Sequence, residues 1–157
     1  MTVDKGKDLT ASLEDYLEAI FNLAGRASVA RSKDIAQMLG VSKPSVTEAL
    51  QVLKKKGLAN YKPYGSVTLT ESGRAAGAEI ARRHTILKSF FVSVLGVDGD
   101  MAQEAACKAE HALGPGIIGR LLCFVEFVGE TDRDGYNVTR RFKRYYKGRT
   151  KTVRSRE

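Results

Sequence analysis

The fold of this chain is decided by one stretch of its sequence, SKDIAQMLGVSKPSVTEALQVLKKKGLANYKPYGSVTLT, which runs from Ser32 to Thr70. Apolar residues recur in its first part at helical spacing, and Gly40 and Gly57 are typical of helix ends. Two short apolar runs then flank Pro63-Tyr64-Gly65, a combination typical of a hairpin turn. The stretch predicts a helix capped by Ser32 and ending at Leu39, a second helix from Ser42 to about Lys56, and strands at about 58–62 and 66–70.

Helical patterns lie on both sides of this stretch. The periodicity predicts further helices at about 11–25, 71–95, 100–113 and 117–128, with a loop at 129–135. The chain is therefore expected to be mainly α, with an N-terminal winged helix-turn-helix domain followed by an all-helical domain. We place the domains at 1–72 and 73–130, followed by a basic tail at 131–157.

The second helix of the quoted stretch has two distinct faces. Its apolar stripe consists of Val46, Ala49, Leu50 and Leu53, and its outer stripe of Pro44, Thr47, Glu48, Gln51 and Lys55. A helix-turn-helix needs this division, because its second helix presents polar groups to base edges in the major groove. The hairpin would be a wing that contacts the phosphate backbone through Lys62 and Tyr64. The segment therefore predicts binding of double-stranded DNA.

The charge of the chain is unevenly distributed. The formal net charge is +8, and residues 137–157 hold nine Lys/Arg against one acidic residue, so residues 1–136 sum to zero. Such a tail either binds phosphates or is a solvated, partly disordered end. The sequence has no apolar run that would span a membrane and no apolar signal-peptide core, so we expect a cytoplasmic protein. Two cysteines are too few for a disulfide framework.

One predicted helix carries a chelating face. Cys107, Glu110 and His111 fall at i, i+3 and i+4, so thiolate, carboxylate and imidazole project from one turn. His84, on the inward face of the preceding helix, is a further candidate ligand. The opposite, apolar face of the helical wheel, which permits close helix packing across a dimer interface, consists of Ala102, Ala105, Ala109, Ala112 and Leu113.

Several motifs occur in one order along the chain. They are LEDYLEAI (Leu13–Ile20), KDIA (Lys33–Ala36), VS (Val41–Ser42), PSVT (Pro44–Thr47), VTLT (Val67–Thr70) and CKAEH (Cys107–His111). In these motifs the chain resembles the family of the diphtheria toxin repressor and the manganese transport regulator, in its two-domain form. The resemblance covers about residues 10–128 and implies a homodimeric, metal-dependent repressor that binds a palindromic operator and acts on metal-uptake genes.

The resemblance also implies a role for individual residues. Asp15 matches a first-helix ligand of the manganese regulators, and Glu18 matches a ligand of their second metal. Cys107, Glu110 and His111 match the primary site of the iron-type members, and His84 matches a ligand in both types. In the recognition helix, Ser42, Pro44, Ser45 and Thr47 match DNA-facing positions of the family. The full set of candidate DNA-binding residues is Ser32, Lys33, Ser42, Lys43, Pro44, Ser45, Thr47, Glu48, Gln51 and Lys62.

The chain departs from the iron-type members at three points. Their ancillary metal site has Glu and His at the positions of Lys88 and Gln103, so that site is expected to be absent here. Glu48 stands where those members read bases with Gln, and we expect no counterpart of their third domain. Two roles of Lys88 stay open, either a cation that pairs with Glu110 or Glu18, or a surface lysine that extends into solvent.

The ligand set favours one group of metals. Thiolate favours iron(II), with cobalt, nickel and zinc also able to bind, whereas manganese(II) prefers oxygen donors. We therefore expect iron(II) first and manganese(II) second as co-repressor, and a single cation that links the DNA-binding half to the helical half. Two alternatives stay open. One is a winged-helix regulator that senses an organic ligand, and the other is a metal hydrolase that uses Glu110 or Glu18 as base. We do not expect an enzyme, because no nucleophile constellation is recognisable.

Overall fold

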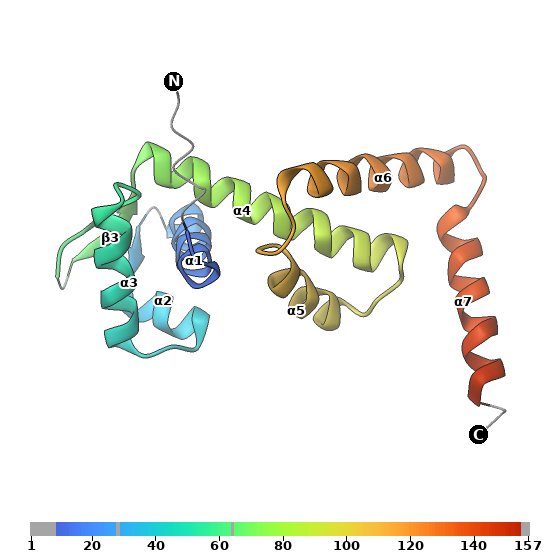
Figure 1. Ribbon diagram of the computed structural model, residues 1–157, viewed down its shortest axis with the longest axis horizontal. Helices are drawn as coiled ribbons and strands as arrows, with labels where there is room; N and C mark the ends of the chain where they lie inside the picture. The colour runs from blue at the N-terminus through green and yellow to red at the C-terminus, as the bar shows by residue number, and fades with distance from the viewer. Residues whose placement is uncertain (1–8, 28, 64, 155–157) are drawn as a thin grey trace. The chain divides into compact units, whose positions relative to one another are not determined.

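The computed structural model describes residues 9–27, 29–63 and 65–154, and the chain divides into two compact units, Met1–Arg82 and Arg83–Glu157 (Figure 1). The described part of the first unit contains α1 (Ala11–Ala27), β1 (Ala30–Arg31), α2 (Ser32–Leu39), α3 (Lys43–Lys55), β2 (Ala59–Tyr61), β3 (Ser66–Leu69) and the first part of α4 (Glu71–Ser89). The second unit contains the end of α4, the π-helical turn η1 (Phe90–Val94), α5 (Gly99–Ala109), α6 (Pro115–Arg133) and α7 (Val138–Arg154).

The first unit is a winged helix-turn-helix, as the sequence predicts. Its strands form an antiparallel sheet in the order β1-β3-β2, with Ala59 opposite Leu69 and Tyr61 opposite Val67. These four side chains are buried, and the intervening Asn60 is exposed, which is the alternation expected for a sheet with one solvated face. The hairpin therefore packs its inner face onto the helices.

The core of the first unit fixes the position of α3. The predicted stripe of α3 is buried, so its opposite face is left at the surface. Ser42 caps the helix by accepting a hydrogen bond from the Ser45 amide at 3.3 Å, and Pro44 lies in the first turn, where its missing N–H is harmless. The completely buried side chains packed around α3 include Leu17, Ile20, Ile35, Leu58, Val67 and Ile80.

The prediction for the first unit is wrong in two details. Strand β1 was not predicted, because a strand of two residues shows no alternation, yet Ala30 pairs with Val67. Ser32 is the first residue of α2 and not its cap, since Arg31 occupies the cap position without a side-chain hydrogen bond. The chain thus passes directly from β1 into α2. The predicted wing residue Tyr64 lies outside the described residues.

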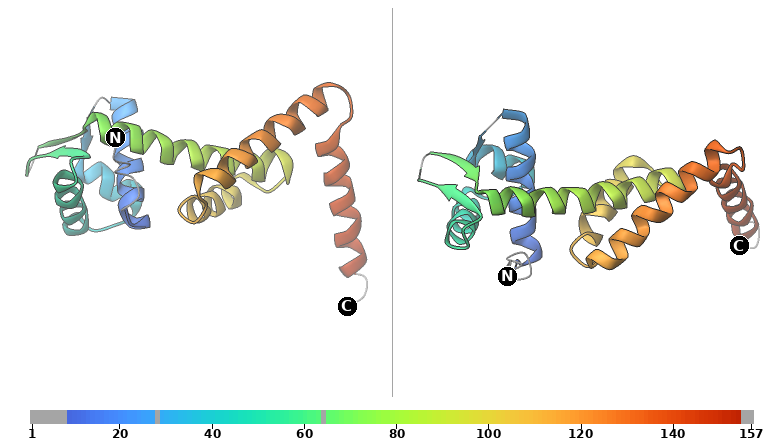
Figure 2. Two further views of the ribbon diagram at one scale, coloured as in Figure 1. Left: turned by 45° about the horizontal axis from the view of Figure 1, so that its top comes forward. Right: turned by 90° about the horizontal axis from the view of Figure 1, so that it is seen from above.

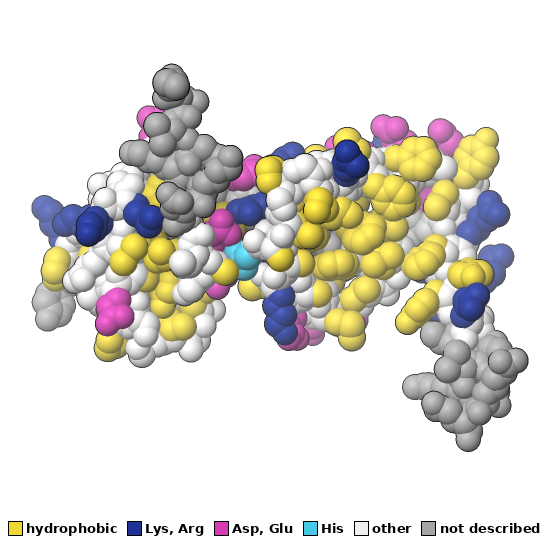
Figure 3. All heavy atoms as spheres, viewed as in Figure 1, with side chains coloured by type: hydrophobic (Ala, Val, Ile, Leu, Met, Phe, Trp, Pro, Cys, Tyr) yellow, Lys and Arg dark blue, Asp and Glu magenta, His cyan; other side chains and the backbone are white. Residues whose placement is uncertain are grey.

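The second unit is helical and has its own core. Ile86 and Leu87 of α4, Ala106 of α5 and Ile118 of α6 form a buried cluster, against which Phe91 and neighbouring residues pack. Large hydrophobic side chains are also exposed in this unit, and Figure 3 shows many yellow side chains gathered over it. The most exposed in α5 and α6 are Met101, Ile117, Phe124 and Phe127.

The ends of α4 and α6 in the second unit differ from the prediction. α4 ends at Ser89 and continues as the π-helical turn η1, where one continuous helix was predicted. α6 extends to Arg133 through the predicted loop, because Gly129 has ordinary helical geometry and only Gly135 has a positive φ, +91°. The sequence pattern predicted a loop over the whole range between these two glycines.

The basic tail contains a regular helix, α7, where partial disorder was one of the expectations. α7 follows the end of α6 after a turn (Figure 2). Near the end of α6 the Asp132 carboxylate accepts a hydrogen bond from the Thr139 amide, 3.3 Å from Oδ2, and hydrogen bonding to Thr139, chiefly through its side chain, lowers the pKa of Asp132. A carboxylate near a helix N-terminus also stabilises the helix, because its negative charge interacts favourably with the helix dipole. Among the described residues, no helix is long and apolar enough to cross a membrane.

Candidate metal centre

Glu110 is the one charged side chain that is completely buried among the residues that the structure describes. It lies at the end of α5, where it continues the buried stripe formed by Ala102 and Ala106 at i, i+4 and i+8. An isolated buried carboxylate would cost several kcal/mol of folding free energy, so it requires polar partners. The partners of Glu110 are therefore the first indication of its role.

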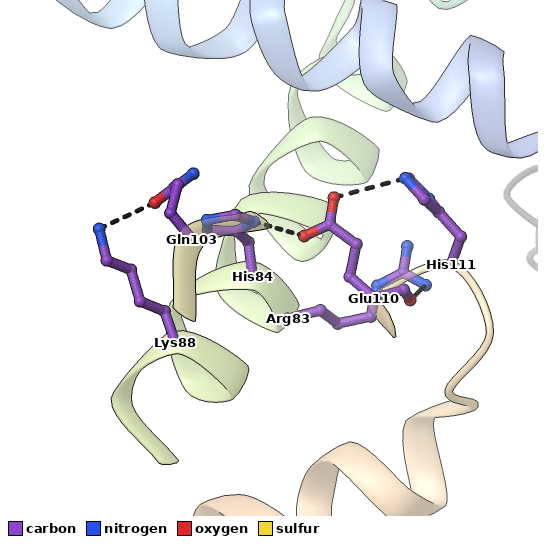
Figure 4. Close-up of polar contacts among 6 residues, drawn as sticks. All are labelled: Arg83, His84, Lys88, Gln103, Glu110 and His111. Carbon is purple, nitrogen blue, oxygen red and sulfur yellow. Dashed lines mark hydrogen bonds and ion pairs between the residues drawn. The ribbon is translucent and has the colours of Figure 1, made fainter. Parts of the chain in front are cut away.

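Two imidazoles flank the Glu110 carboxylate (Figure 4). His84 Nδ1 on α4 lies 2.7 Å from Oε2, and His111 Nε2 lies 3.5 Å from Oε1. Only 12% of the His84 side chain and 13% of the His111 side chain are exposed. Both candidate histidines predicted from the sequence thus meet at one buried carboxylate.

The backbone at Glu110 is held by a residue that the sequence reading missed. Arg83 Nη1 donates a hydrogen bond to the Glu110 carbonyl oxygen at 3.2 Å, next to the His84–Glu110 pair. The helix α5 ends at Ala109, and the Leu113 amide still donates to the Ala109 carbonyl oxygen at 3.1 Å. Arg83 therefore positions the turn that carries Glu110 and His111. Its place beside His84 in the sequence was the only available signal.

The predicted apolar face of α5 needs correction. Ala106 is buried although the helical wheel left it out, and Ala112 is exposed although it was included. α5 stops before Ala112, so a wheel drawn to Leu113 gives Ala112 a direction that the backbone no longer follows, whereas Ala106 lies one regular turn after the buried Ala102. The buried side of α5 therefore includes Glu110, and the chelating residues do not lie on one exposed face.

Cys107 is an exposed thiol one helical turn before Glu110. Its Sγ lies within 4.8 Å of a Glu110 carboxylate oxygen, and a ring nitrogen of His84 lies within the same distance of that carboxylate. Thiolate, carboxylate and imidazole at this spacing form a donor set that suits divalent transition metals. The residues of the second unit therefore fit a metal ion.

Lys88 and Gln103 are hydrogen-bonded to each other. Lys88 Nζ donates to Gln103 Oε1 at 2.8 Å (Figure 4). The two residues that replace the ancillary-site ligands of the iron-type members are therefore in direct contact. In this exposed contact the Lys88 cation meets a neutral amide. The remaining candidate ligands, Asp15 and Glu18, lie half-buried on α1 of the first unit.

The candidate DNA-binding residues lie mainly at the surface of the first unit. Thr47 is half-buried, and its hydroxyl donates to the Lys43 carbonyl oxygen at 3.1 Å. The Ser42 and Ser45 hydroxyls are 2.8 Å apart and belong to the cap of α3. Ser32 is also half-buried, and the exposed candidates are Lys33, Ser42, Lys43, Pro44, Ser45, Glu48, Gln51 and Lys62.

Comparison with known families decides what these two units are. Residues 8–67 match the model of the iron dependent repressor N-terminal DNA binding domain, and residues 70–136 match that of the iron dependent repressor metal binding and dimerisation domain. The chain belongs to the iron-dependent repressor family. Its members are metal-dependent transcriptional repressors and not enzymes, and its two domains indicate DNA and a second copy of the chain as partners.

Relatives of known sequence are HTH-type transcriptional regulators. It is 37% identical over 119 residues to an uncharacterised HTH-type transcriptional regulator of Methanocaldococcus jannaschii, a match that covers 75% of this chain and 95% of the relative. It is 34% identical over 123 residues to the HTH-type transcriptional regulator MntR of Bacillus subtilis, a match that covers 78% of this chain and 86% of MntR.

Solved structures give the same family. A manganese-dependent transcriptional repressor in complex with manganese matches with a TM-score of 0.65 and 32% identity, over 73% of this chain and 53% of that one. The IdeR of T. acidophilum matches with a TM-score of 0.63 and 28% identity, over 69% and 51%. The chain thus spans about half the length of these two solved structures.

Proposed function

We propose that this member of the family uses iron(II) as its co-repressor, with manganese(II) as the second candidate. The observation that carries the proposal is the buried Glu110 carboxylate between His84 and His111, with the Cys107 thiol one turn away. Cys107 distinguishes the metals, since thiolate ligands favour iron(II) over manganese(II). Zinc(II), cobalt(II) and nickel(II) are expected to bind the same donors in vitro.

The ligands that we assign to the metal come from both units. Cys107, Glu110, His111 and His84 would hold it from the helical unit, and we propose that Asp15 and Glu18 add carboxylates from α1. The assignment of these two carboxylates rests on the sequence resemblance. A bound divalent cation would supply positive charge that offsets these carboxylates and the thiolate. Its effect on DNA binding requires a higher metal affinity in the DNA-competent arrangement than in any other.

We further propose that α3 reads a palindromic operator in the major groove. The exposure of Pro44, Glu48 and Gln51 on α3 supports this assignment, as does the exposure of Lys62 beside the hairpin tip. The Glu48 carboxylate can accept a hydrogen bond from a cytosine amino group, whereas a glutamine side chain pairs best with adenine. We propose that the protein acts in the cytoplasm and that its targets are metal-uptake genes. We also propose domain limits of 1–72 and 73–130, followed by the tail at 131–157.

The experiment that tests the function is an anaerobic DNA-binding titration. An operator is first selected from a random-sequence duplex library with metal-loaded protein, and binding is then measured with iron(II), manganese(II), zinc(II) and chelator. We expect metal to tighten operator binding by at least about tenfold, a coupling of about 1.4 kcal/mol. Operator binding that chelator leaves unchanged would contradict the proposal and favour an organic ligand.

The identity of residue 107 is expected to set metal preference. Cys107→Glu replaces the thiolate with an oxygen donor at the same helical position, so it should shift the preference towards manganese(II). The shift is measured as the ratio of the iron(II) and manganese(II) concentrations that give half-maximal operator binding. Cys123→Ser, at the other exposed cysteine, is the control and should leave the ratio unchanged. An identical ratio in wild type and Cys107→Glu would remove Cys107 from the ligand set.

A second metal is expected to bind when the Lys88–Gln103 pair is replaced by ligands. The side chains of the two residues already meet at 2.8 Å, so Lys88→Glu with Gln103→His should place a carboxylate and an imidazole together. Metal stoichiometry, measured by equilibrium dialysis, should rise by about one ion per chain. Lys88→Gln alone is the control, since it removes the cation without adding a strong ligand. An unchanged stoichiometry in the double variant would contradict this prediction.

A further inference from the structure

The helix α7 carries the surplus positive charge of the chain. Its range, Val138–Arg154, holds eight of the 26 lysines and arginines and no acidic residue. The other residues contain 18 of each sign, so the whole net charge of +8 belongs to this helix. α7 also lies beyond residue 136, where the match to the family models ends. Family membership therefore does not explain it.

An open groove on α7 is lined by arginines. Its lining residues are Arg141, Arg144, Tyr145, Gly148 and Arg149, which recur at helical spacing on one face. Gly148 has no side chain and leaves space between the arginines, since a Cβ at this position would meet nothing within 4 Å. Arg149 donates to the Tyr145 hydroxyl at 3.0 Å and lies 5.7 Å from its ring centroid, which holds its guanidinium at the edge of the groove.

The charges of α7 repel one another. Arg140 and Arg144 are exposed and lie one turn apart, as do the exposed Lys143 and Lys147. Like charges at i and i+4 destabilise a helix, and α7 contains no acidic residue to offset them. A polyanion bound along this helix would relieve the repulsion. The charge pattern is therefore complementary to a row of phosphates.

Duplex DNA is the polyanion that we assign to this surface, because the first unit matches the model of a DNA-binding domain. Helices that lie in a membrane surface also combine Lys and Arg with aromatic residues, so the test below includes lipid vesicles. On α7, Phe142 and Tyr146 stack on each other with ring centroids 6.4 Å apart. Nucleic-acid affinity depends chiefly on Lys and Arg that neutralise phosphates, and outside α7 this chain has no surplus of them.

We propose that α7 binds backbone phosphates of the DNA duplex through the groove between Arg141, Arg144 and Arg149. Arginine guanidinium groups bind phosphate oxygens with two parallel hydrogen bonds. Such contacts are independent of sequence, so α7 adds affinity for DNA without selecting the operator. This inference rests on the proposed function, because it assumes that the chain binds DNA.

The test measures the salt dependence of DNA binding with full-length, metal-loaded protein. Arg141→Gln/Arg144→Gln is compared with wild type on the selected operator and on a scrambled duplex, over a series of salt concentrations. Each lost phosphate contact lowers the magnitude of the slope of log affinity against log salt by about 0.9, so we expect a decrease of about 1.8 per protomer. The affinity for both duplexes should fall by the same factor, which leaves their ratio unchanged.

Two controls separate phosphate binding from general effects of charge and fold. Arg120→Gln/Arg133→Gln removes the same charge from exposed positions of α6 and should keep the wild-type slope. Arg141→Lys/Arg144→Lys keeps the charge of the groove, so this variant should also keep the wild-type slope. Circular dichroism checks that each variant retains its helices.

The outcomes separate this inference from the proposed function. A wild-type slope in Arg141→Gln/Arg144→Gln would overturn the inference alone. The same conclusion holds if that variant keeps its DNA slope but loses binding to phosphatidylserine vesicles, because α7 would then be a membrane element. Failure of the wild-type protein to bind its selected operator in a metal-dependent way would overturn both proposals.

Discussion

Replacing Glu110 with glutamine is expected to abolish metal-dependent DNA binding while the fold survives. The glutamine amide has the shape of the carboxylate, and its oxygen can still accept a hydrogen bond from His84 Nδ1, which lies 2.7 Å from Glu110 Oε2. It carries no charge, however, and neutral amides are poor ligands for transition metals compared with carboxylates. We expect metal affinity to fall by at least about 100-fold, since loss of an outer partner of a metal ligand alone costs 10–100-fold.

The measurement for Glu110→Gln has three parts. Metal affinity is followed by calorimetric titration, operator binding by fluorescence anisotropy, and the metal-free fold by thermal unfolding. Glu126→Gln, an exposed glutamate of α6, is the matched control and should behave as wild type in all three. If Glu110→Gln responded to the same metal concentrations as wild type, Glu110 would be a structural partner of the histidines and no ligand.

Replacing Gly73 with alanine is expected to destabilise the first unit strongly. Gly73 is buried near the start of α4, and a Cβ at this position would collide with the carbonyl oxygen of Leu58. That carbonyl oxygen accepts a hydrogen bond from the Thr70 amide at 3.1 Å, and Thr70 Oγ1 also donates to the Gly57 carbonyl oxygen at 2.7 Å. The colliding atom is backbone and cannot rotate away, so α4 would have to separate from the residues that precede β2.

The cost of Gly73→Ala should be about 3 kcal/mol in the free energy of unfolding, the upper part of the range for overpacked sites. Urea denaturation measures it. Gly25→Ala in α1 is the matched control, because a Cβ there meets nothing within 4 Å and alanine should stabilise a helix by about 0.5–1 kcal/mol. Equal denaturation midpoints for Gly73→Ala and wild type would show that α4 does not approach Leu58 so closely.

Most of the first unit could be predicted from the sequence, because the sequence signals for its helices and turns are local. The cap at Ser42, the apolar stripe of α3 and the glycine at position 57, with φ of +72°, all act within one turn of the residue concerned. The two-residue strand β1 could not be predicted in this way, since it exists only through its pairing with β3. The prediction failed where an element depends on a distant partner.

The candidate metal centre was predicted as a set of residues and not as an arrangement. The spacing of Cys107, Glu110 and His111 identified donor atoms, and its inward position and the family resemblance identified His84. The predicted apolar face omitted Ala106, so the wheel placed Glu110 with the exposed Cys107, although Glu110 continues the buried stripe of Ala102 and Ala106. The structure instead buries Glu110 beside His84, and it pairs Lys88 with Gln103.

The sequence by itself determined the fold class of this protein, its family and the donor atoms available to a metal, because periodicity, helix ends and ordered motifs are properties of neighbouring residues. Only the tertiary structure decided that Glu110 is buried against a histidine 26 residues away, that Gly73 lies against Leu58, and that the basic tail forms a helix with an arginine-lined groove. These features depend on packing between helices and on where each helix stops, and both are set by contacts that no local pattern contains.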